Sequence, residues 1–559
     1  MSSGYVLDLC SMSEEDTILL NQMYGRYKRE YVRMLDWLSK WKNTVYWWAT
    51  PLSARNWYLS EALKNICIAL VGIIRLQENS QIRKIYCPSK EIAETIEKYC
   101  KKIKRRVDFE SKKENEDVTI YKQIFIFAHL IKNEIDRYKK LNKALKRGKT
   151  HYPEQNEEIT LIDTYIKESE VCEGYEEQYF RKILDYTKEN IYFLPDIFQN
   201  TNIPINMLVK KILESPRYKY IFREQFLQIS DYYKLFLYPF FCMAFCLPRK
   251  YINKVDVTSI VNLDLCKGIT SGNAINGMLK YFTIKRMKAQ GIKIGRLIGW
   301  YEGQPSSNGL FLAYRKEYPK GKSIGYIGYA IDNNSINVAP SKVQMRHKAV
   351  PQEMAVMAEC FKQIPKQFVP YINVMIVPAL RLQKAFQYID SQKKDGKRIL
   401  VALPIERKTS RAILQWIKGL ENYCRENGIE ILIKNHPCNV GLTLRQYGIQ
   451  ELICDYQFVS GEFSKAVGEA DIVITMQSNA GYETALYGKP IIFLNLPSQL
   501  NMNYMPKEWK EQRYKVVYDI EELKAAINDF LNVKLEKINL DNEKFHVSAS
   551  VEKVSRLFQ

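Results

Sequence analysis

Apolar and polar positions alternate regularly along the C-terminal part of the chain. Short apolar runs, typical of buried strands, are separated by segments in which apolar residues recur at helical spacing. The pattern predicts strands at 398–405, 429–434, 471–475, 490–494 and 516–518, and helices at 410–427, 463–468, 480–487 and 519–531. Gly428 and Gly488 follow two of these helices, as glycine does at helix C-termini. This alternation predicts a parallel sheet in a Rossmann-like domain.

The N-terminal part also reads as α/β, with less regular spacing. Strands are expected at 82–88, 158–166, 190–198, 292–300, 323–330 and 371–377, and helices within 47–76, from Ser89, and at 175–189, 274–290 and 307–317. Several prolines between 363 and 378 suggest a domain boundary. We therefore expect an N-terminal Rossmann-like domain with helical insertions (1–375), a C-terminal Rossmann-like domain (376–540), and a last segment (541–559) whose helix near 548–558 crosses back.

Two segments depart from this α/β pattern. Residues 101–149 are rich in Lys, Arg and Glu around an apolar helix at 121–131, which predicts a basic helical insertion with a solvated face. Residues 202–249 are helical and aromatic, and include the charge-free run 235–247. That run is too short to cross a bilayer and contains a proline. A buried core helix is expected there, and contact with an anionic membrane interface is the alternative, because basic residues flank the run.

Composition narrows the class of partner. The chain has 559 residues, 46% hydrophobic and 26% charged, which excludes a disordered, collagen-like or disulfide-scaffold protein. Lys and Arg total 83 against 62 Asp and Glu, a formal charge of +21 that favours an anionic partner such as nucleic acid, lipid or a phosphorylated small molecule. No nucleic-acid-binding motif is present, so nucleic acid is not expected. Twelve scattered cysteines and five histidines show no metal-ligand spacing. They indicate reduced thiols in the cytoplasm, and no signal peptide is visible.

Two polar segments follow expected strands of the C-terminal domain. Lys434-Asn435-His436-Pro437 follows the strand 429–434, and Gln477 to Glu483 leads from the strand 471–475 into a helix. In a parallel α/β sheet ligands bind at the carboxyl edge, and a helix N-terminus with small residues accepts an anion. Ser478 adds a hydroxyl, and Glu483 is placed to bind sugar hydroxyls. Together the two segments predict a phosphate and ribose site without a metal.

These motifs resemble those of a known family. The His436-Pro437 pair with Ser478-x-x-Gly481-x-Glu483 and the later Gly488-Lys489-Pro490 is similar to bacterial glycosyltransferases of the GT-B fold, including sialyl- and Kdo-transferases and surface carbohydrate biosynthesis proteins. Residues 47–72 and 300–304 share the resemblance, whereas 101–149 have no clear counterpart. The resemblance implies two Rossmann-like domains facing a cleft.

The same resemblance implies roles for single residues. His436 and Ser478 would bind the phosphate of a CMP-sugar, in a site shared with Lys434, Pro437, Asn479, Gly481 and Glu483. Glu302, followed by Gly303, would be the general base, although Tyr301 stands where the family often has a second acidic residue. A structural carboxylate is the alternative for Glu302.

Weaker candidates lie outside these motifs. Thr409 and Ser410 enter a helix after the strand 398–405 and are nucleotide-binding candidates, with a solvated loop and helix cap as the alternative. Arg55, Asn56 and Gln304 are candidate acceptor-binding residues.

The expected function is inverting, metal-independent transfer of an acidic sugar (Kdo, sialic acid or another nonulosonic acid) from a CMP-sugar to a bacterial surface glycan. The donor takes the place of a cofactor. The expected partners are that donor and a glycan or lipid-linked glycan acceptor, with the protein in the cytoplasm or peripheral at the inner face of the plasma membrane. Alternatives are a CDP-glycerol- or UDP-sugar-dependent transferase of cell-surface polymer synthesis, and a non-catalytic basic glycan- or nucleic-acid-binding protein.

Overall fold

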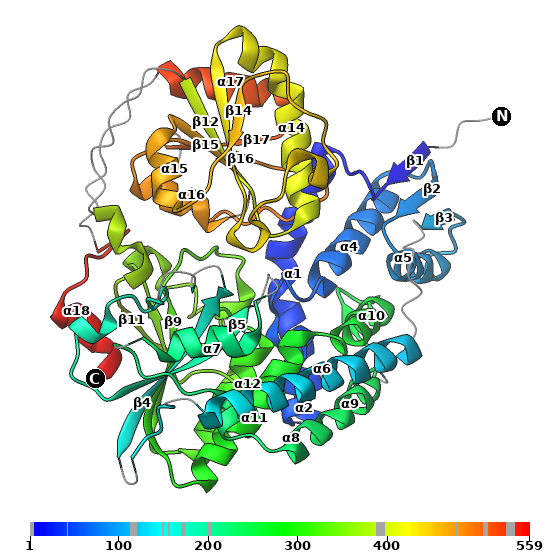
Figure 1. Cartoon of the computed structure of the whole chain (residues 1–559). Coiled ribbons are helices and arrows are strands. Elements are labelled where there is room, and N and C mark those ends of the chain that lie inside the picture. The colour runs from blue at the N-terminus through cyan, green and yellow to red at the C-terminus, as the bar shows by residue number, and fades with distance from the viewer. Residues whose placement is uncertain are drawn as a thin grey trace.

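The structure is a computed structural model of the whole chain (Figure 1). It describes residues 5–41, 43–111, 120–147, 150–154, 157–168, 171, 175–198, 203–215, 217–246, 248–386, 397–476, 478–506, 513–532 and 543–559. Gln477 of the second polar segment, Leu247 of the apolar run, and the expected domain limit at 540 lie outside the described residues.

The C-terminal sheet has the order expected of a Rossmann-like domain. Its six strands are all parallel, in the order β14-β13-β12-β15-β16-β17. Numbered along the domain, this is the order 3-2-1-4-5-6 of dinucleotide-binding folds. The strands are β12 (Lys397–Ala402), β13 (Ile429–Lys434), β14 (Tyr456–Phe458), β15 (Ile472–Thr475), β16 (Ile491–Leu494) and β17 (Tyr514–Val517). The helices are α14 (Arg407–Glu426), α15 (Phe463–Glu469), α16 (Asn479–Leu486) and α17 (Ile520–Asn532).

Glycines end two of these helices as the sequence predicts. Gly428 and Gly488 have φ values of 63° and 73°, the left-handed conformation that glycine adopts without steric cost. Among the described strands of the C-terminal domain, only β14 was not expected, because its three residues carry little pattern.

The N-terminal domain is built on a second parallel sheet of six strands, in the order β11-β10-β9-β8-β4-β5. These strands are β4 (Glu158–Lys167), β5 (Ile191–Phe198), β8 (Lys293–Trp300), β9 (Lys322–Ile327), β10 (Glu353–Val356) and β11 (Asn373–Ile376). The helices α11 (Gly272–Ala289) and α12 (Pro305–Glu317) pack together beside it. Strand order reverses between β4 and β8, and in the other sheet between β12 and β15. The chain therefore contains two Rossmann-like sheets, as expected.

Residues 5–111 include a small sheet of their own. The sequence predicted its strand at 82–88 and the helix from Ser89, but not the two strands that flank it. A parallel sheet of three strands, β1 (Tyr5–Asp8), β2 (Ile82–Cys87) and β3 (Asp108–Ser111), lies apart from the six-stranded sheet. Its helices are α1 (Glu14–Trp41), α4 (Ala62–Glu78) and α5 (Lys90–Lys102), which Ser89 caps by accepting a hydrogen bond from Ile92 N. Two short helices, α2 (Val45–Trp48) and α3 (Pro51–Ala54), join α1 to α4.

The prediction of a helix at 175–189 is wrong. The described segment is a loop with one short 3₁₀ turn, η2 (Ile183–Asp185). The buried carboxylate of Glu177 accepts hydrogen bonds from Tyr179 N and Phe180 N, and also from Thr164 Oγ1 of β4. Because this side chain takes up backbone N–H groups, the chain turns here instead of continuing a helical ladder.

Helices cover one end of the N-terminal domain. They are α6 (Ile120–Arg147), α7 (Ile205–Leu213), α8 (Ile229–Lys234), α9 (Tyr238–Phe245) and α10 (Thr258–Gly268), with the short turn η4 (Leu235–Leu237) linking α8 to α9. The apolar run expected to be a buried core helix is buried on one side only. Leu235, Tyr238 and Cys242 are buried, whereas Phe240 is 64% exposed. Of the helices in the described residues, none is both long and apolar enough to cross a membrane.

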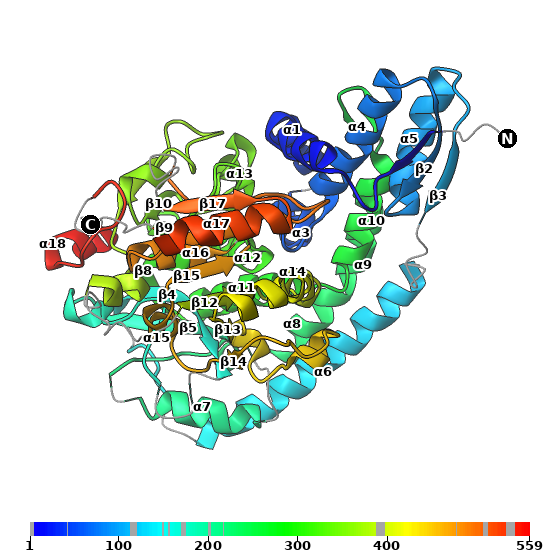
Figure 2. The same cartoon turned by 90° about the horizontal axis from the view of Figure 1, so that it is seen from above.

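The two domains are in direct contact. The change from one six-stranded sheet to the other falls between Ile376 and Lys397, and the expected limit at residue 375 lies inside β11. Asn479 Oδ1 at the start of α16 accepts a hydrogen bond from Ala330 N of the N-terminal domain. The last helix, α18 (Val551–Ser555), returns to the first sheet, where Val554 is buried. Figure 2 shows α18 beside the strands of the N-terminal domain, although it follows the C-terminal domain in the sequence.

Candidate functional site

A cleft of about 2260 Å³ lies between the two six-stranded sheets. Both topological switch points open onto it. The N-terminal sheet contributes Tyr165 and Lys167 at the end of β4, and Glu302 after β8. The C-terminal sheet contributes the residues after β12 and Ser478 after β15. Ligands of open α/β sheets bind at such points, so the cleft brings two binding edges face to face.

The Lys434–Pro437 segment lies on the C-terminal wall of this cleft, at the end of β13. Lys434 is buried, and its Nζ donates a hydrogen bond of 2.7 Å to Gly461 O. Burial lowers the pKa of Lys434. Pro437 opens a short 3₁₀ turn that the His436 side chain caps, because His436 Nδ1 accepts a hydrogen bond of 3.1 Å from Cys438 N. The proline and the cap together fix the orientation of the imidazole.

The protonation state of His436 follows from its surroundings. Burial, with a smaller contribution from the cation of Lys167 across the cleft, lowers its pKa to about 4. The ring is therefore neutral at physiological pH. Since Nδ1 accepts the bond from Cys438 N, the ring proton is on Nε2. His436 thus offers one N–H donor to a ligand in the cleft, and no charge.

The second polar segment starts α16 at the same wall. Ser478 caps the helix, with Oγ accepting a hydrogen bond of 3.1 Å from Ala480 N. Ser478 and Asn479 both line the cleft, but the Asn479 side chain is held by Ala330 across the domain contact. Gly481 faces the core instead, where a Cβ would lie 2.4 Å from the ring of Phe493. Its smallness lets α16 pack closely on β16.

Glu483 lines the cleft one turn further along α16. Its carboxylate lies 3.9 Å from the guanidinium of Arg381. Burial raises the pKa of Glu483, while the cations of Arg381 and Lys167 oppose that rise. A carboxylate so placed can accept hydrogen bonds from hydroxyl groups of a ligand.

Of the two nucleotide-binding candidates near the start of α14, one lines the cleft and the other does not. Thr409 lines the cleft and donates from Oγ1 to Glu406 Oε2 at 2.6 Å. Ser410 is fully buried, is not among the lining residues, and donates to Pro404 O. The Ser410 hydroxyl therefore ties the loop after β12 to the helix.

Glu302 lies on the opposite wall, directly after β8. Its carboxylate accepts hydrogen bonds from Trp300 Nε1 at 2.8 Å and from Gln304 Nε2 at 2.7 Å, one on each oxygen. Each oxygen keeps a second lone pair for a further donor. Gly303 has a φ of 60°, and a Cβ there would lie 2.2 Å from Asn337 O, so the residue after Glu302 has to be glycine. Tyr301 is buried on the far side of the strand, against Phe311.

The three expected acceptor-binding residues line the N-terminal wall. Asn56 donates from Nδ2 to the backbone oxygen of Glu302 at 3.0 Å, so it fixes the turn that carries Glu302. Gln304 holds the Glu302 carboxylate and also lies 3.4 Å from Tyr165 Oη. Arg55 is 3% exposed and donates to Ala339 O and Gln344 Oε1, while its Nε and Nη1 make no hydrogen bond within the described residues.

Sequence reasoning did not select several residues of the cleft. Lys167 and Tyr165 lie at the carboxyl end of β4. Arg381 lies in the segment between β11 and β12 that joins the two domains. The guanidinium of Arg381 lies 5.9 Å from the centre of the Trp300 ring. A cation at the end of a buried strand is the one signal that could have pointed to Lys167. No group of three or more His, Cys, Asp or Glu side chains within the described residues is arranged to hold a metal ion.

The two Rossmann-like sheets face each other across the cleft, which is the arrangement expected of a GT-B fold. No protein-family description and no curated protein matches the sequence. The UDP-GlcNAc 2-epimerase of Methanocaldococcus jannaschii, solved with UDP-GlcNAc and UDP, aligns with 72% of this chain and 99% of its own, at 12% identity and a TM-score of 0.43. MnaA of S. aureus, solved with UDP, aligns with 70% and 94% at 8% identity and a TM-score of 0.43. MurG of Acinetobacter baumannii aligns with 71% and 94% at 12% identity and a TM-score of 0.34.

Proposed function

We propose that this protein is a glycosyltransferase whose donor is a nucleotide-activated sugar, specifically a CMP-linked acidic sugar, and whose acceptor is a hydroxyl group of a surface glycan or lipid-linked glycan. One observation carries the proposal. The carboxyl edges of both sheets meet in one cleft, with His436, Lys434 and the start of α16 on one wall and the carboxylate of Glu302, held by hydrogen bonds, on the other.

The C-terminal wall suits the nucleotide. The Nε2–H of His436 and the start of α16 at Ser478 present neutral donors to a phosphate oxygen, and Lys434 adds a cation nearby. Donors fixed before the reaction stabilise the charge that develops on a departing phosphate. Glu483 can accept hydrogen bonds from sugar hydroxyls. The donor therefore lies with its phosphate toward α16.

The N-terminal wall suits the acceptor and the base. In the proposed reaction Glu302 takes the proton of the acceptor hydroxyl while its oxygen bonds to the anomeric carbon of the sugar. The bond from that carbon to the phosphate oxygen breaks, CMP leaves, and the anomeric configuration inverts. Trp300 and Gln304 keep the carboxylate in place by donating to its two oxygens.

Nucleotide titration tests the donor. Calorimetry with CMP, CDP, UMP, UDP and GDP on the full chain should show binding that is selective for CMP. Selectivity for UDP or CDP would replace the donor and leave the transferase proposal standing. If none of the five binds, the transferase proposal fails.

A substitution at Glu302 tests the base. Glu302→Gln keeps the size of the side chain and removes its basicity, so turnover of a CMP-linked acidic sugar should fall by about 10² to 10⁴. Nucleotide affinity should stay within twofold, because Glu302 lies on the other wall. Glu469→Gln, the same change at an exposed position that does not line the cleft, is the matched control and should keep most of the turnover. Full activity in Glu302→Gln would give the base role to another residue.

A further inference from the structure

A stripe of large apolar side chains faces solvent along the segment Ile229–Phe245. The elements α8, η4 and α9 follow one another here without a break, as one helical rod. Its inner side is buried in the core through Leu235, Tyr238 and Cys242. The outer side exposes six apolar residues at helical spacing, which are Ile229, Tyr233, Phe236, Leu237, Phe240 and Met243. A helix that is apolar all round needs a second apolar neighbour.

The neighbouring helix α6 continues this surface and adds positive charge. Tyr121 and Phe125, in its first two turns, are 81% and 78% exposed. Further along, four exposed lysines recur at helical spacing: Lys132, Lys139, Lys143 and Lys146. At 3.6 residues per turn these six side chains fall within an arc of about 60°. The outer face of α6 therefore begins with aromatic residues and continues as a row of cations.

The rod and α6 lie side by side and antiparallel. The ring of Phe127, on α6, lies 6.4 Å from Phe236 and 5.8 Å from Tyr238, and Tyr138 further along lies 5.2 Å from Tyr232. Figures 1 and 2 both show α6 alongside α8 and α9, and in the second view α6 forms the outer edge of the molecule. Since Phe236 belongs to the exposed stripe and contacts α6, the stripe reaches the aromatic start of α6.

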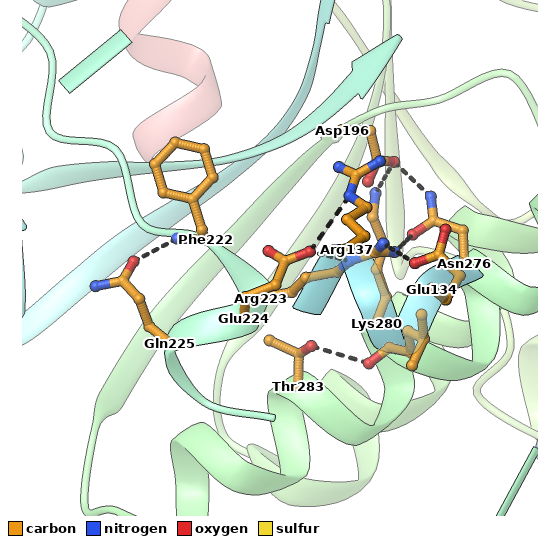
Figure 3. Close-up of polar contacts among 11 residues, drawn as sticks. Glu134, Arg137, Asp196, Phe222, Arg223, Glu224, Gln225, Asn276, Lys280 and Thr283 are labelled. Atoms are coloured by element: carbon orange, nitrogen blue, oxygen red, sulfur yellow. Dashed lines mark hydrogen bonds and ion pairs between the residues drawn. The ribbon is translucent and has the colours of Figure 1, made fainter. Parts of the chain in front are cut away.

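Buried ion pairs hold α6 in this orientation (Figure 3). On its inner side Glu134 pairs with Arg223 at 2.6 Å, and Arg137 lies 3.7 Å from Glu224. Arg223 is 8% exposed and also donates to Asn276 of α11 at 2.6 Å. Breaking a buried pair is costly, so α6 cannot readily roll its aromatic residues inward. The exposed surface is a fixed feature of the fold.

We propose that this surface, the docking face, binds an anionic lipid bilayer. The docking face comprises the exposed side chains of α6 from Tyr121 to Lys146 and those of the rod from Ile229 to Met243. Aromatic side chains insert at the level of the lipid headgroups, and the lysine row lies over anionic phosphates.

Charge favours a bilayer over a second copy of the chain. The segment of α6 holds eight Lys and Arg against two Asp and Glu, within a chain of formal charge +21. Two copies meeting through this face would bring lysine rows together in a low-dielectric contact. An anionic membrane surface instead attracts each lysine. The inference goes beyond the proposed transferase activity, because lipid binding can be measured without turnover.

Vesicle sedimentation with the full chain tests the docking face. Vesicles of phosphatidylcholine with 30% phosphatidylglycerol should bind the protein at least tenfold more tightly than phosphatidylcholine alone, and 0.5 M NaCl should weaken that binding. The double variant Phe125→Ser/Phe240→Ser should lose at least tenfold in affinity for the anionic vesicles. Both side chains are mostly exposed, so their loss should not unfold the protein. Urea unfolding followed by circular dichroism reports that each variant is folded.

A matched pair of charge variants locates the effect. Lys139→Glu/Lys143→Glu should lose at least tenfold, whereas Lys397→Glu/Lys465→Glu, with the same charge change on exposed positions of the C-terminal domain, should stay within twofold. Equal losses in the two pairs would overturn the proposal in favour of general attraction to a basic protein. Absence of wild-type binding to anionic vesicles would also overturn it. So would a concentration-dependent dimer that Phe125→Ser/Phe240→Ser abolishes while vesicle binding is unaffected.

Discussion

The ring of His436 provides the sharpest test of the nucleotide site, because its two nitrogens have separate tasks. Nδ1 accepts the hydrogen bond from Cys438 N that shapes the turn, and Nε2 carries the proton available to a phosphate. Asparagine can place an oxygen near the position of Nδ1 and has no group at Nε2. Glutamine can place an amide N–H near Nε2 and loses the cap. The two substitutions therefore separate the structural role from the binding role.

The expected loss follows from one hydrogen bond to a charged group. Such a bond contributes about 1.5 to 3 kcal/mol, which corresponds to a roughly 10- to 150-fold change in Kd. His436→Asn should therefore weaken CMP binding by that factor and leave the unfolding free energy nearly unchanged. His436→Gln should keep more of the affinity and lose about 1 kcal/mol of stability with the cap. Calorimetry gives the affinities, and denaturant titration gives the stabilities.

Protonation adds a second readout to the same experiment. With a pKa near 4, the ring stays neutral from pH 5.5 to 8. The ratio of wild-type to His436→Asn affinity should then be constant over that range, and the ratio cancels the titration of the phosphate itself. If the imidazolium were the binding form, the ratio would fall about tenfold per pH unit as the pH rises. Either that slope, or wild-type affinity in the asparagine variant, would refute the neutral-donor argument.

Three further outcomes follow from buried contacts, each read by urea unfolding. Gly481→Ala places a methyl group against the Phe493 ring, and should cost about 1 to 3 kcal/mol; an unchanged midpoint would mean that α16 shifts freely on its sheet. Lys280→Met removes the cation that pairs with the buried Asp163 and the partly buried Asp196, and should cost about 3 to 5 kcal/mol, whereas Lys285→Met, exposed on the same helix, should cost less than about 0.5 kcal/mol. Burial raises the pKa of Glu177 to about 7, so between its ordinary pKa and 7 the unfolded chain loses the proton first and stability falls as pH rises. Glu177→Gln should abolish this pH dependence, so between pH 4.5 and 8 its free energy of unfolding should rise relative to that of the wild type by up to about 3 kcal/mol. If the unfolding free energies of the two proteins changed in parallel with pH, that would contradict the buried, protonated carboxyl.

Local pattern predicted the C-terminal domain well, for a physical reason. The four inner strands there, β13, β12, β15 and β16, are apolar runs buried on both faces. Gly428 and Gly488 mark the ends of two helices. Polar residues directly after a strand then lie at the carboxyl edge by geometry alone. Lys434, His436 and Ser478 were found in this way, and the structure places all three along the cleft.

The features of the fold and of the cleft that the sequence did not predict depend on contacts between distant segments. Lys167 ends an ordinary buried strand, and it influences His436 only because the two domains face each other. The turn at Glu177 depends on Thr164, which lies 13 residues earlier. The run at 235–247 has the composition of a core helix, and only the packing of α6 beside it decides which side chains stay exposed. Periodicity reports burial along one element and carries no information about such pairings.

The short helix α16 connects the two halves of the proposed reaction. Its first turn carries Ser478 at the nucleotide wall, and its next residue, Asn479, receives the N–H of Ala330 from the other domain. Further along, Tyr482 is buried in the same core cluster as residues of the N-terminal domain. A phosphate that binds at the start of α16 therefore meets a helix whose position both domains fix. In the proposed reaction, the distance from the donor phosphate to Glu302 would therefore depend on the contact between the two domains.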